Sequence, residues 1–135
     1  MNIVDFAFNY VVVFLIVLTI LVFVHEWGHY WVARRAGVRV EVFSIGFGPE
    51  IYGWTDKHDT RWKISAIPLG GYVKMFGEAD LGWEEEEESR PLSPEEKAVS
   101  FHHKKLWQRS AIVAAGPIAN FIFAAVLVAL LAGIV

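Results

Sequence analysis

Apolar residues gather at the two ends of this 135-residue chain, and a more polar middle separates them. Between residues 6 and 24, Asn9 and Thr19 are the polar interruptions. At about 1.5 Å per helical residue this run spans roughly 28 Å, close to the hydrocarbon core of a bilayer. A second run, residues 111–135, carries no charge. We therefore predict two transmembrane helices, the first of which ends at Gly37.

The middle of the chain follows a two-residue period instead. Val38, Val40 and Val42 alternate with other residues as in a half-buried strand, and turn signals then separate further apolar runs. The later strands are predicted at residues 51–54, 61–67 and 72–76. Their apolar composition predicts an antiparallel sheet that dips into the membrane as a re-entrant element. An amphipathic sheet that rests on the two helices is the alternative.

These patterns predict a membrane protein that is mainly α, with two transmembrane helices flanking a small antiparallel, re-entrant β-sheet. An acidic run at residues 84–88 is typical of a solvated, flexible loop. Ser93, Pro94 and Glu96 predict a short capped helix, and residues 101–109 predict an interfacial helix. The predicted domains are 1–37 with the first transmembrane helix, 38–77 with the membrane-associated sheet, 78–100 with the acidic loop, and 101–135 with the interfacial helix and the second transmembrane helix.

Positive charge indicates how the helices cross the membrane. All twelve Lys and Arg residues lie between Arg34 and Arg109, and several stand next to each predicted span. By the positive-inside rule, the connecting region is cytoplasmic and both chain ends lie outside. The net charge of −3 and the lack of a basic, aromatic-rich pattern argue against a nucleic-acid partner. Because the chain has no cysteine, any metal must bind to His or carboxylate groups.

The strongest chemical signal is His25-Glu26-Trp27-Gly28-His29, at the end of the first apolar run. Positions four apart share one face of a helix, so His25 and His29 can direct imidazole nitrogens at one metal ion. Two His ligands leave positions for a third ligand and a water, as catalytic zinc requires. Glu26 can act as general base toward that water, whose pKa the metal lowers. Chance would produce roughly 0.015 such motifs in a chain of this composition.

Three features near the motif have two interpretations each. Gly28 allows either the close approach of another group or helix packing. Asn120 is a lone polar residue in the second apolar run, and it either packs between helices, which the pattern slightly favours, or hydrogen-bonds at the active site. For His25 and Glu26, the alternative to metal chemistry is that they simply end a transmembrane helix at the level of the lipid headgroups.

Five segments in order make the chain resemble the site-2 protease family of intramembrane zinc metalloproteases, most closely its RseP type, the regulators of a sigma-factor pathway. The first segment is shared with many soluble proteases, but the set together is specific and covers nearly the whole chain. The segments are His25–His29, Phe43–Pro49, Ile67–Met75, Phe101 with Lys105 and Arg109, and Ala115–Phe121.

The resemblance implies that His25 and His29 bind Zn²⁺ and that Glu26 is the catalytic acid–base group. It also implies that the hairpin around Gly70, Gly71 and Tyr72 is the family's re-entrant β element, which receives substrate. The implied activity is a metalloendopeptidase that cleaves transmembrane segments of single-span membrane proteins, such as an anti-sigma factor, in regulated intramembrane proteolysis. The implied location is the cell inner membrane, where the lipid bilayer is a further partner.

The chain departs from the family in one respect, because it contains no Leu-Asp-Gly motif. In the family, the Asp of that motif is the third zinc ligand. We therefore expect this chain to carry half of an active site and to depend on the remaining C-terminal part of the protease, with its PDZ domains and Asp-bearing helix. A non-catalytic membrane module and a metal-transport subunit are the alternative functions.

Overall fold

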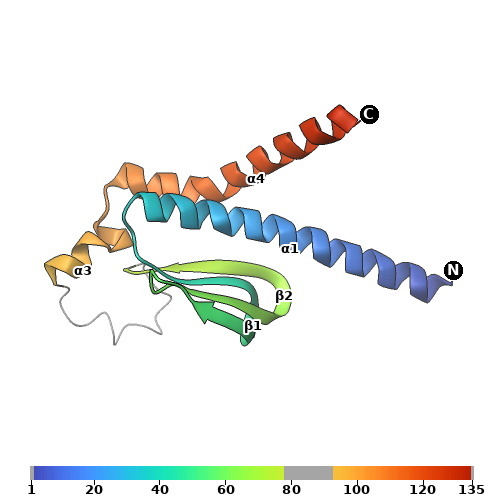
Figure 1. The fold of residues 1–135 in the computed structure, drawn as a ribbon, viewed down its shortest axis with the longest axis horizontal. Coiled ribbons are helices and arrows are strands. Elements are labelled where there is room, and N and C mark those ends of the chain that lie inside the picture. Colours follow the sequence, from blue (N-terminus) through green and yellow to red (C-terminus); the bar gives the residue numbers. More distant parts are fainter. Residues whose placement is uncertain (1, 78–92, 135) are drawn as a thin grey trace.

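A computed structural model describes residues 2–77 and 93–134 of the chain. Figure 1 shows that the first helix lies between the last helix on one side and a β-sheet on the other. The sheet and both long helices meet near the C-terminal end of the first helix. The elements in chain order are α1 (Ile3–Arg35), β1 (Val40–Thr55), β2 (Arg61–Met75), α3 (Pro94–Ala98), the 3-10 turn η1 (Phe101–His103) and α4 (Leu106–Ile134).

The first predicted helix is confirmed as α1, which begins three residues before the apolar run. Asn2 caps it, because the Asn2 side chain accepts a hydrogen bond from the backbone N–H of Asp5. At the other end Gly37 has a φ of 81°, and its N–H donates to the Arg34 carbonyl while that of Val38 donates to the Ala33 carbonyl. This left-handed glycine with its two hydrogen bonds ends the helix at the predicted position.

The predicted interfacial helix over residues 101–109 is wrong. Residues 101–103 form the 3-10 turn η1, and the N–H of Phe101 donates to the carbonyl of Phe76 at the end of the sheet. Lys104 is extended, with a ψ of 159°, so the chain cannot continue as one helix from η1 into α4. Residues 106–109 instead form the first turn of α4, which then passes without a break through Gly116 and Pro117.

The prediction of four separate strands is also wrong, because the structure has two long strands. At the predicted turns these strands bend but do not end. β1 continues through Gly46 and Gly48, whose φ values are 91° and 82°. Glycine adopts this left-handed backbone without a steric cost, so the strand can change direction and keep its pairing. β2 likewise continues through the predicted turn at residues 68–71. The sheet is antiparallel, as predicted.

The bends let each long strand pair more than once. The first part of β1 lies between two parts of β2, because Val42 pairs with both Arg61 and Lys74, and Ile45 with both Ile64 and Gly71. The first part of β2 in turn lies between two parts of β1, because Arg61 pairs with both Val42 and Thr55. Residues 71–75 therefore form one edge of the sheet in the described part of the chain, and this edge lies beside α1.

A small core holds the three layers together at the end of α1. Tyr30 and Ala33 from α1, Phe43 from β1 and Ile112 from α4 are all buried there, together with Val38, Val40 and Met75. The rings of Trp62 and Phe43 stack with their centroids 4.5 Å apart, and the ring of Trp54 also stacks on that of Trp62, with centroids 6.2 Å apart. This core fixes how α4 and the sheet approach the last turns of α1, where the His motif stands.

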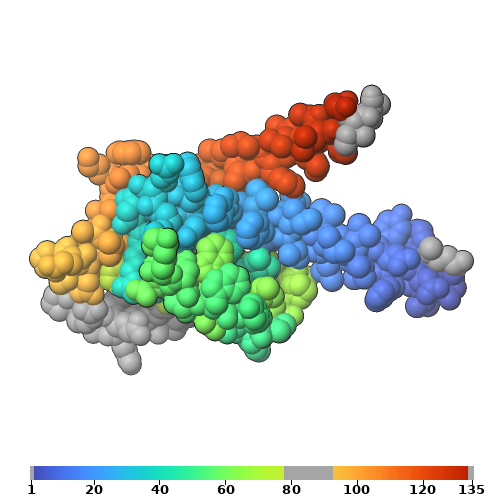
Figure 2. Space-filling view, in the orientation of Figure 1, coloured from blue at the N-terminus to red at the C-terminus, as the bar shows by residue number. Residues whose placement is uncertain are grey.

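The remaining surface of the helices is strongly apolar. Both α1 and α4 are long and apolar enough to cross a membrane. In Figure 2 the N-terminal part of α1 and the C-terminal part of α4 project away from the rest of the molecule, and many of their large apolar side chains, such as Phe8 and Leu130, are exposed. The short helix α3 has the predicted capping box between Ser93 and Glu96. The acidic run at residues 84–88 lies outside the described residues.

Candidate metal centre

The two histidines of the motif face each other on one side of α1. His25 and His29 are separated by one helical turn, and both are half-buried. Their Nε2 atoms are 3.1 Å apart, and their rings meet edge to face with centroids separated by 4.8 Å. The spacing in the sequence thus produces two imidazole nitrogens directed at one point.

A backbone carbonyl of α4 orients His29. The Nδ1 atom of His29 lies 2.7 Å from the carbonyl oxygen of Ile112. A carbonyl can only accept a hydrogen bond, so Nδ1 carries the proton and donates it. The other ring nitrogen, Nε2, therefore keeps its lone pair and is free to bind a metal. This is the usual way in which a second contact fixes the tautomer of a metal-binding histidine.

Asn120 provides the corresponding contact for His25. Its side-chain amide Nδ2 lies 3.4 Å from the Nδ1 atom of His25. The sequence slightly favoured a packing role for this residue, whereas the structure places its amide beside the motif. Asn120 lies four residues after Gly116 on α4, so both residues share the helix face that meets α1.

Gly116 is part of this arrangement, and the sequence reasoning missed that role. A Cβ atom at this position would lie 2.7 Å from Cε1 of His29 and 2.8 Å from Cε1 of His25. Both rings therefore occupy the space that a side chain would need. The spacing in the sequence could have indicated this role. Gly116 and Asn120 are four residues apart, so a residue without a side chain and a polar residue lie on the same helix face.

Gly28 lies where α1 and α4 cross. A Cβ atom there would be 2.7 Å from the Cβ of Ala119 and would also overlap the carbonyl oxygen of Ala115. Of the two interpretations left open by the sequence, the structure shows helix packing at this position. Close packing at Gly28 brings the two helices near enough for His29 to reach the Ile112 carbonyl.

Glu26 lies on the side of α1 that faces the sheet. A Cβ atom on Gly71 would be 3.6 Å from Cγ of Glu26 and 2.8 Å from Cγ1 of Val22. The edge of β2 thus passes directly over the carboxylate-bearing turn. Gly70 and Tyr72 are next to it, and both contact Phe47, whose ring stacks on Tyr72 with centroids 6.2 Å apart. The predicted acid–base residue and the predicted substrate-binding residues are therefore neighbours.

Comparison with known proteins places this geometry in a family. Residues 13–135 match peptidase family M50. The chain belongs to peptidase family M50. It is 55% identical over 130 residues to a protein of Agrobacterium fabrum named "Putative zinc metalloprotease Atu1380", and these residues are 96% of this chain and 34% of that protein. It is 52% identical over 111 residues to the regulator of sigma-E protease RseP of Salmonella typhimurium, covering 82% of this chain and 23% of that protein.

The M50 chain spans about a third or less of the length of these relatives. Family membership agrees with the resemblance seen in the sequence, and the two long apolar helices agree with the membrane location that this resemblance implies. The names of the relatives also agree with zinc as the metal.

The geometry of the M50 chain fits a zinc ion. Two nitrogen ligands at the usual Zn–N distance in a tetrahedral site lie about 3.3 Å apart, close to the 3.1 Å between the two Nε2 atoms. No group of three or more His, Cys, Asp or Glu side chains that could hold a metal occurs in residues 2–77 and 93–134. The described residues thus offer two candidate ligands, His25 and His29.

The aspartates of the described region are placed away from the histidines. Asp5 lies in the first turn of α1, at the opposite end of the helix. The carboxylate of Asp56 accepts hydrogen bonds from Nε1 of Trp62 and from the N–H groups of His58 and Thr60. Burial alone would raise the pKa of Asp56, but these hydrogen bonds together lower it. Asp80 lies outside the described residues.

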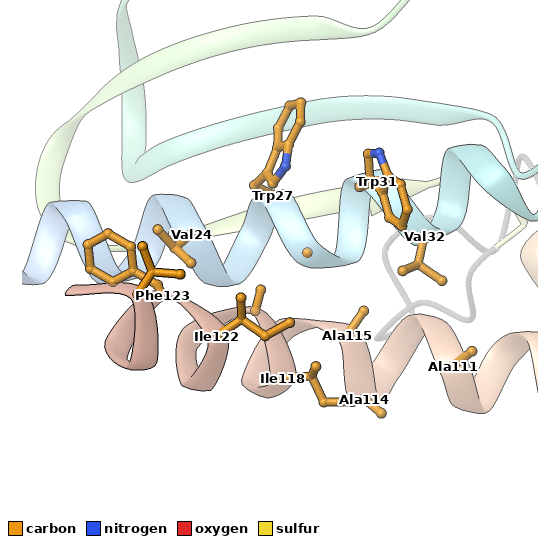
Figure 3. A pocket seen from close by; sticks show the side chains of 13 residues that line it. Val24, Trp27, Trp31, Val32, Ala111, Ala114, Ala115, Ile118, Ile122 and Phe123 are labelled. Atoms are coloured by element: carbon orange, nitrogen blue, oxygen red, sulfur yellow. The ribbon is translucent and has the colours of Figure 1, made fainter. Parts of the chain in front are cut away.

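A groove of about 650 Å³ runs between α1 and α4, as Figure 3 shows. Trp27 and Trp31 line it from α1, and alanines, isoleucines and Phe123 line it from α4. All of its lining residues are apolar, and His25, Glu26 and His29 are not among them. The groove is therefore separate from the metal centre and has no groups for acid–base or metal chemistry.

Proposed function

We propose that this chain forms the N-terminal part of an intramembrane zinc metalloprotease, in which it supplies two zinc ligands, the acid–base group and the strand that holds the substrate. The observation that carries the proposal is the pair of facing Nε2 atoms of His25 and His29, on the same helix as Glu26, which follows His25 and lies beside the edge of β2. The third ligand then comes from the rest of the protease, which in M50 relatives is longer than this chain.

Different residues of the chain would take different parts in peptide hydrolysis. His25 and His29 would hold the ion through Nε2, and zinc, when bound, polarises the substrate carbonyl and makes water more acidic. Glu26 accepts the proton of the attacking water and passes it to the departing amine. The Ile112 carbonyl keeps His29 in the tautomer that this role requires.

The edge of β2 could bind a transmembrane substrate in an extended conformation. A transmembrane helix uses its carbonyls in its own hydrogen bonds, so it must unwind before a peptide bond can be attacked. An exposed strand edge can hold the unwound segment by strand addition. Residues 71–73 lie at the edge of the sheet beside α1, and Gly71 presents no side chain between an added strand and Glu26. Single-span membrane proteins, such as an anti-sigma factor, are the substrates that this arrangement suits.

Orientation in the inner membrane follows from charge. The Lys and Arg residues lie in the region that connects α1 and α4, and this region would be cytoplasmic, with both chain ends outside. The sheet then stands at the cytoplasmic side of the bilayer. Its exposed apolar residues, such as Ile51 and Leu69, would enter the membrane beside the metal centre.

The experiment that tests the proposal replaces Glu26 with Gln in the complete protease that carries this chain, reconstituted with a single-span reporter substrate. Loss of the acid–base group lowers the cleavage rate by about 10²–10⁴-fold. Zinc content stays at the wild-type level, because the two histidines are unchanged. Glu95→Gln is the matched control, since Glu95 is an exposed residue of α3.

Cleavage by Glu26→Gln at the wild-type rate would overturn the acid–base role. The comparisons do not favour the alternative functions, but the same preparation tests one of them. A metal-transport subunit would move zinc across the membrane at the same rate in the wild type and in the Glu26→Gln variant, and the proposed protease moves none.

A further inference from the structure

The apolar groove between α1 and α4 has a basic end. Trp31 is one of its lining residues, and the guanidinium carbon of Arg35 lies 4.7 Å from the centroid of the Trp31 ring. Arg35 follows Trp31 by four residues, so it continues the groove face of α1 toward the end of that helix. The side chain of Arg35 therefore stands where the groove reaches the last turn of α1.

The charge at this end is available to an anion. A cation–π contact uses the positive charge of the guanidinium and none of its five N–H donors. Arg35 is exposed, and no salt bridge joins it to an acidic side chain within residues 2–77 and 93–134. The Nζ atom of Lys104 adds charge nearby, because it would lie 3.2 Å from a Cβ atom on Gly37, two residues after Arg35. That amine donates to the uncharged carbonyl of Ala98, so its charge is not neutralised there.

The lining of the groove suits a hydrocarbon chain. Its residues are all apolar, and α4 contributes small side chains that leave space beside α1, at Ala111, Ala114, Ala115 and Ala119 (Figure 3). Trp27 on one wall is 41% exposed and Ile118 on the other is 52% exposed. The groove is thus open along the side of the helices, which faces lipid when α1 and α4 span a bilayer.

The length of the groove matches one leaflet of a membrane. Val24 is the lining residue of α1 farthest from Arg35, and the two are about 16 Å apart along the helix. Half of a hydrocarbon core is about 15 Å. An acyl chain that begins at Arg35 would therefore reach the middle of the bilayer at the far end of the groove.

We propose that the groove binds one anionic phospholipid of the cytoplasmic leaflet, with an acyl chain between α1 and α4 and the phosphate on Arg35. Basic pockets between transmembrane helices on the cytoplasmic side are typical headgroup sites. An uncharged helix would cover the apolar lining equally well but would give Arg35 no anion, so the charge favours the lipid. The proposal goes beyond the proposed function, and it rests on the membrane orientation given there but not on proteolysis.

The first test measures lipid binding to the complete protease in detergent by native mass spectrometry. The probes are dioleoylphosphatidylglycerol and dioleoylphosphatidylcholine, which share acyl chains but differ in net charge. We expect the wild type to bind phosphatidylglycerol more tightly. Arg35→Gln should weaken this binding by at least about 5-fold. Arg34→Gln is the matched control, because it removes the same charge from a different face of α1.

The second test fills the groove. Ala114→Phe places a ring in the space of the acyl chain, so it should weaken phosphatidylglycerol binding at least as much as Arg35→Gln does, through lost methylene contacts. Ala124→Phe is the control, because Ala124 is an exposed residue of α4 that does not line the groove.

A measurement on the wild type covers the case in which a variant fails to fold. Phosphatidylglycerol with a diazirine in its acyl chain is crosslinked by light, and the labelled peptides are identified by mass spectrometry. We expect labelling of groove residues such as Ile118 and Ile122, and competition by unlabelled phosphatidylglycerol. Labelling confined to residues outside the groove would overturn the proposal.

The other outcomes are also decisive. If Arg34→Gln and Arg35→Gln lower the affinity equally, the lipid responds to the general surface charge and the proposed headgroup site is wrong. If Ala114→Phe binds phosphatidylglycerol as tightly as the wild type, the acyl chain does not lie in the groove, and a helix from the rest of the protease becomes the better occupant. None of these results depends on cleavage, so the Glu26→Gln experiment decides the proposed function separately.

Discussion

At the scale of single residues, the missing side chains of three glycines determine what surrounds the motif. Gly28 lets α4 approach α1, Gly116 leaves room for both imidazole rings, and Gly71 lets the edge of β2 pass over Glu26. None of these glycines needs an unusual backbone φ for its role. Each is needed because another group occupies the position of the absent Cβ, which is a property of contacts between distant parts of the chain.

Gly116→Ala tests this directly. The added methyl group would overlap the rings of both His25 and His29, so the rings must turn away from each other or the helices must separate. We expect zinc affinity to fall by at least about 10-fold, in line with the loss of outer contacts at other metal sites. Gly133→Ala is the control on the same helix, because among the described residues no atom outside its own stretch of helix backbone lies within 4 Å of the position its Cβ would take. Equal zinc affinity in both variants would contradict the observed packing.

At the scale of elements, two features can be tested separately. One is the crossing of α1 and α4, and the other is the turn between β1 and β2 at residues 56–60, called the outer turn below. The crossing positions the Ile112 carbonyl and Asn120 against the histidines. Hydrogen bonds to the Asp56 carboxylate stabilise the outer turn. Beside the turn, Arg61 and Glu50 form a bidentate ion pair with N–O distances of 3.0 and 2.7 Å. The Arg61 side chain, through this hydrogen-bonded pair, holds the pKa of Glu50 below its ordinary value.

Gly28→Ala is expected to weaken the crossing. Its methyl group would overlap the Ala115 carbonyl and the Ala119 side chain, and forcing a group into a packed interface costs about 1–3 kcal/mol. Thermal unfolding in detergent, followed by circular dichroism, should show a lower melting temperature than for the wild type. Gly133→Ala serves again as the control. An unchanged melting temperature would show that the helices do not pack at Gly28.

The outer turn is expected to loosen in acid. The folded-state pKa of Asp56 lies below its ordinary value of 3.8, so its contribution to stability is present above that pH and is lost as the pH falls through the folded-state pKa. Hydrogen exchange of the His58 and Thr60 amides, both bonded to Asp56, should show falling protection below about pH 4 after correction for intrinsic rates. In Asp56→Asn the protection should not change over this range. A wild-type protection that is constant down to about pH 2 would contradict the assignment.

At the scale of the whole molecule, two long apolar helices cross near one end, and a sheet packs against α1 at that end. The core of Tyr30, Phe43 and Ile112 joins α1, the sheet and α4 near the metal centre, while the far ends of both helices project alone (Figure 2). A large apolar surface without protein contacts suits lipid or further transmembrane helices. The candidate metal centre thus lies next to the best-packed region of the described residues.

The orientation in the membrane can be checked with single cysteines, because the natural chain has none. His58→Cys lies in the exposed turn between β1 and β2, and Asn2→Cys lies at the start of α1. We expect a membrane-impermeant thiol reagent to label His58→Cys only from the cytoplasmic side and Asn2→Cys only from the outside. Labelling of both from one side would contradict the proposed topology, and the cysteine-free parent controls for background.

Much of the local structure could be predicted from the sequence. The end of α1 at Gly37, the capping box at Ser93 and the extended character of the middle of the chain depend on neighbouring residues, and all are confirmed. The predictions that failed concern continuity. Turn residues were expected to end strands, but pairing across the sheet carries β1 and β2 through their bends. Residues 101–109 were expected to form an interfacial helix, but a hydrogen bond from Phe101 to the Phe76 carbonyl accompanies a 3-10 turn there.

The sequence by itself determined that His25 and His29 share a helix face, because residues four apart are neighbours in any α-helix. It also determined the two apolar helices, since length and composition are local properties. Only the tertiary structure decided that the Ile112 carbonyl and Asn120 meet these rings, that Gly116 leaves room for them, and that Gly71 lies over Glu26. These contacts join residues many positions apart, and they depend on the angle at which helices cross and the register at which strands pair, which no short stretch of sequence encodes.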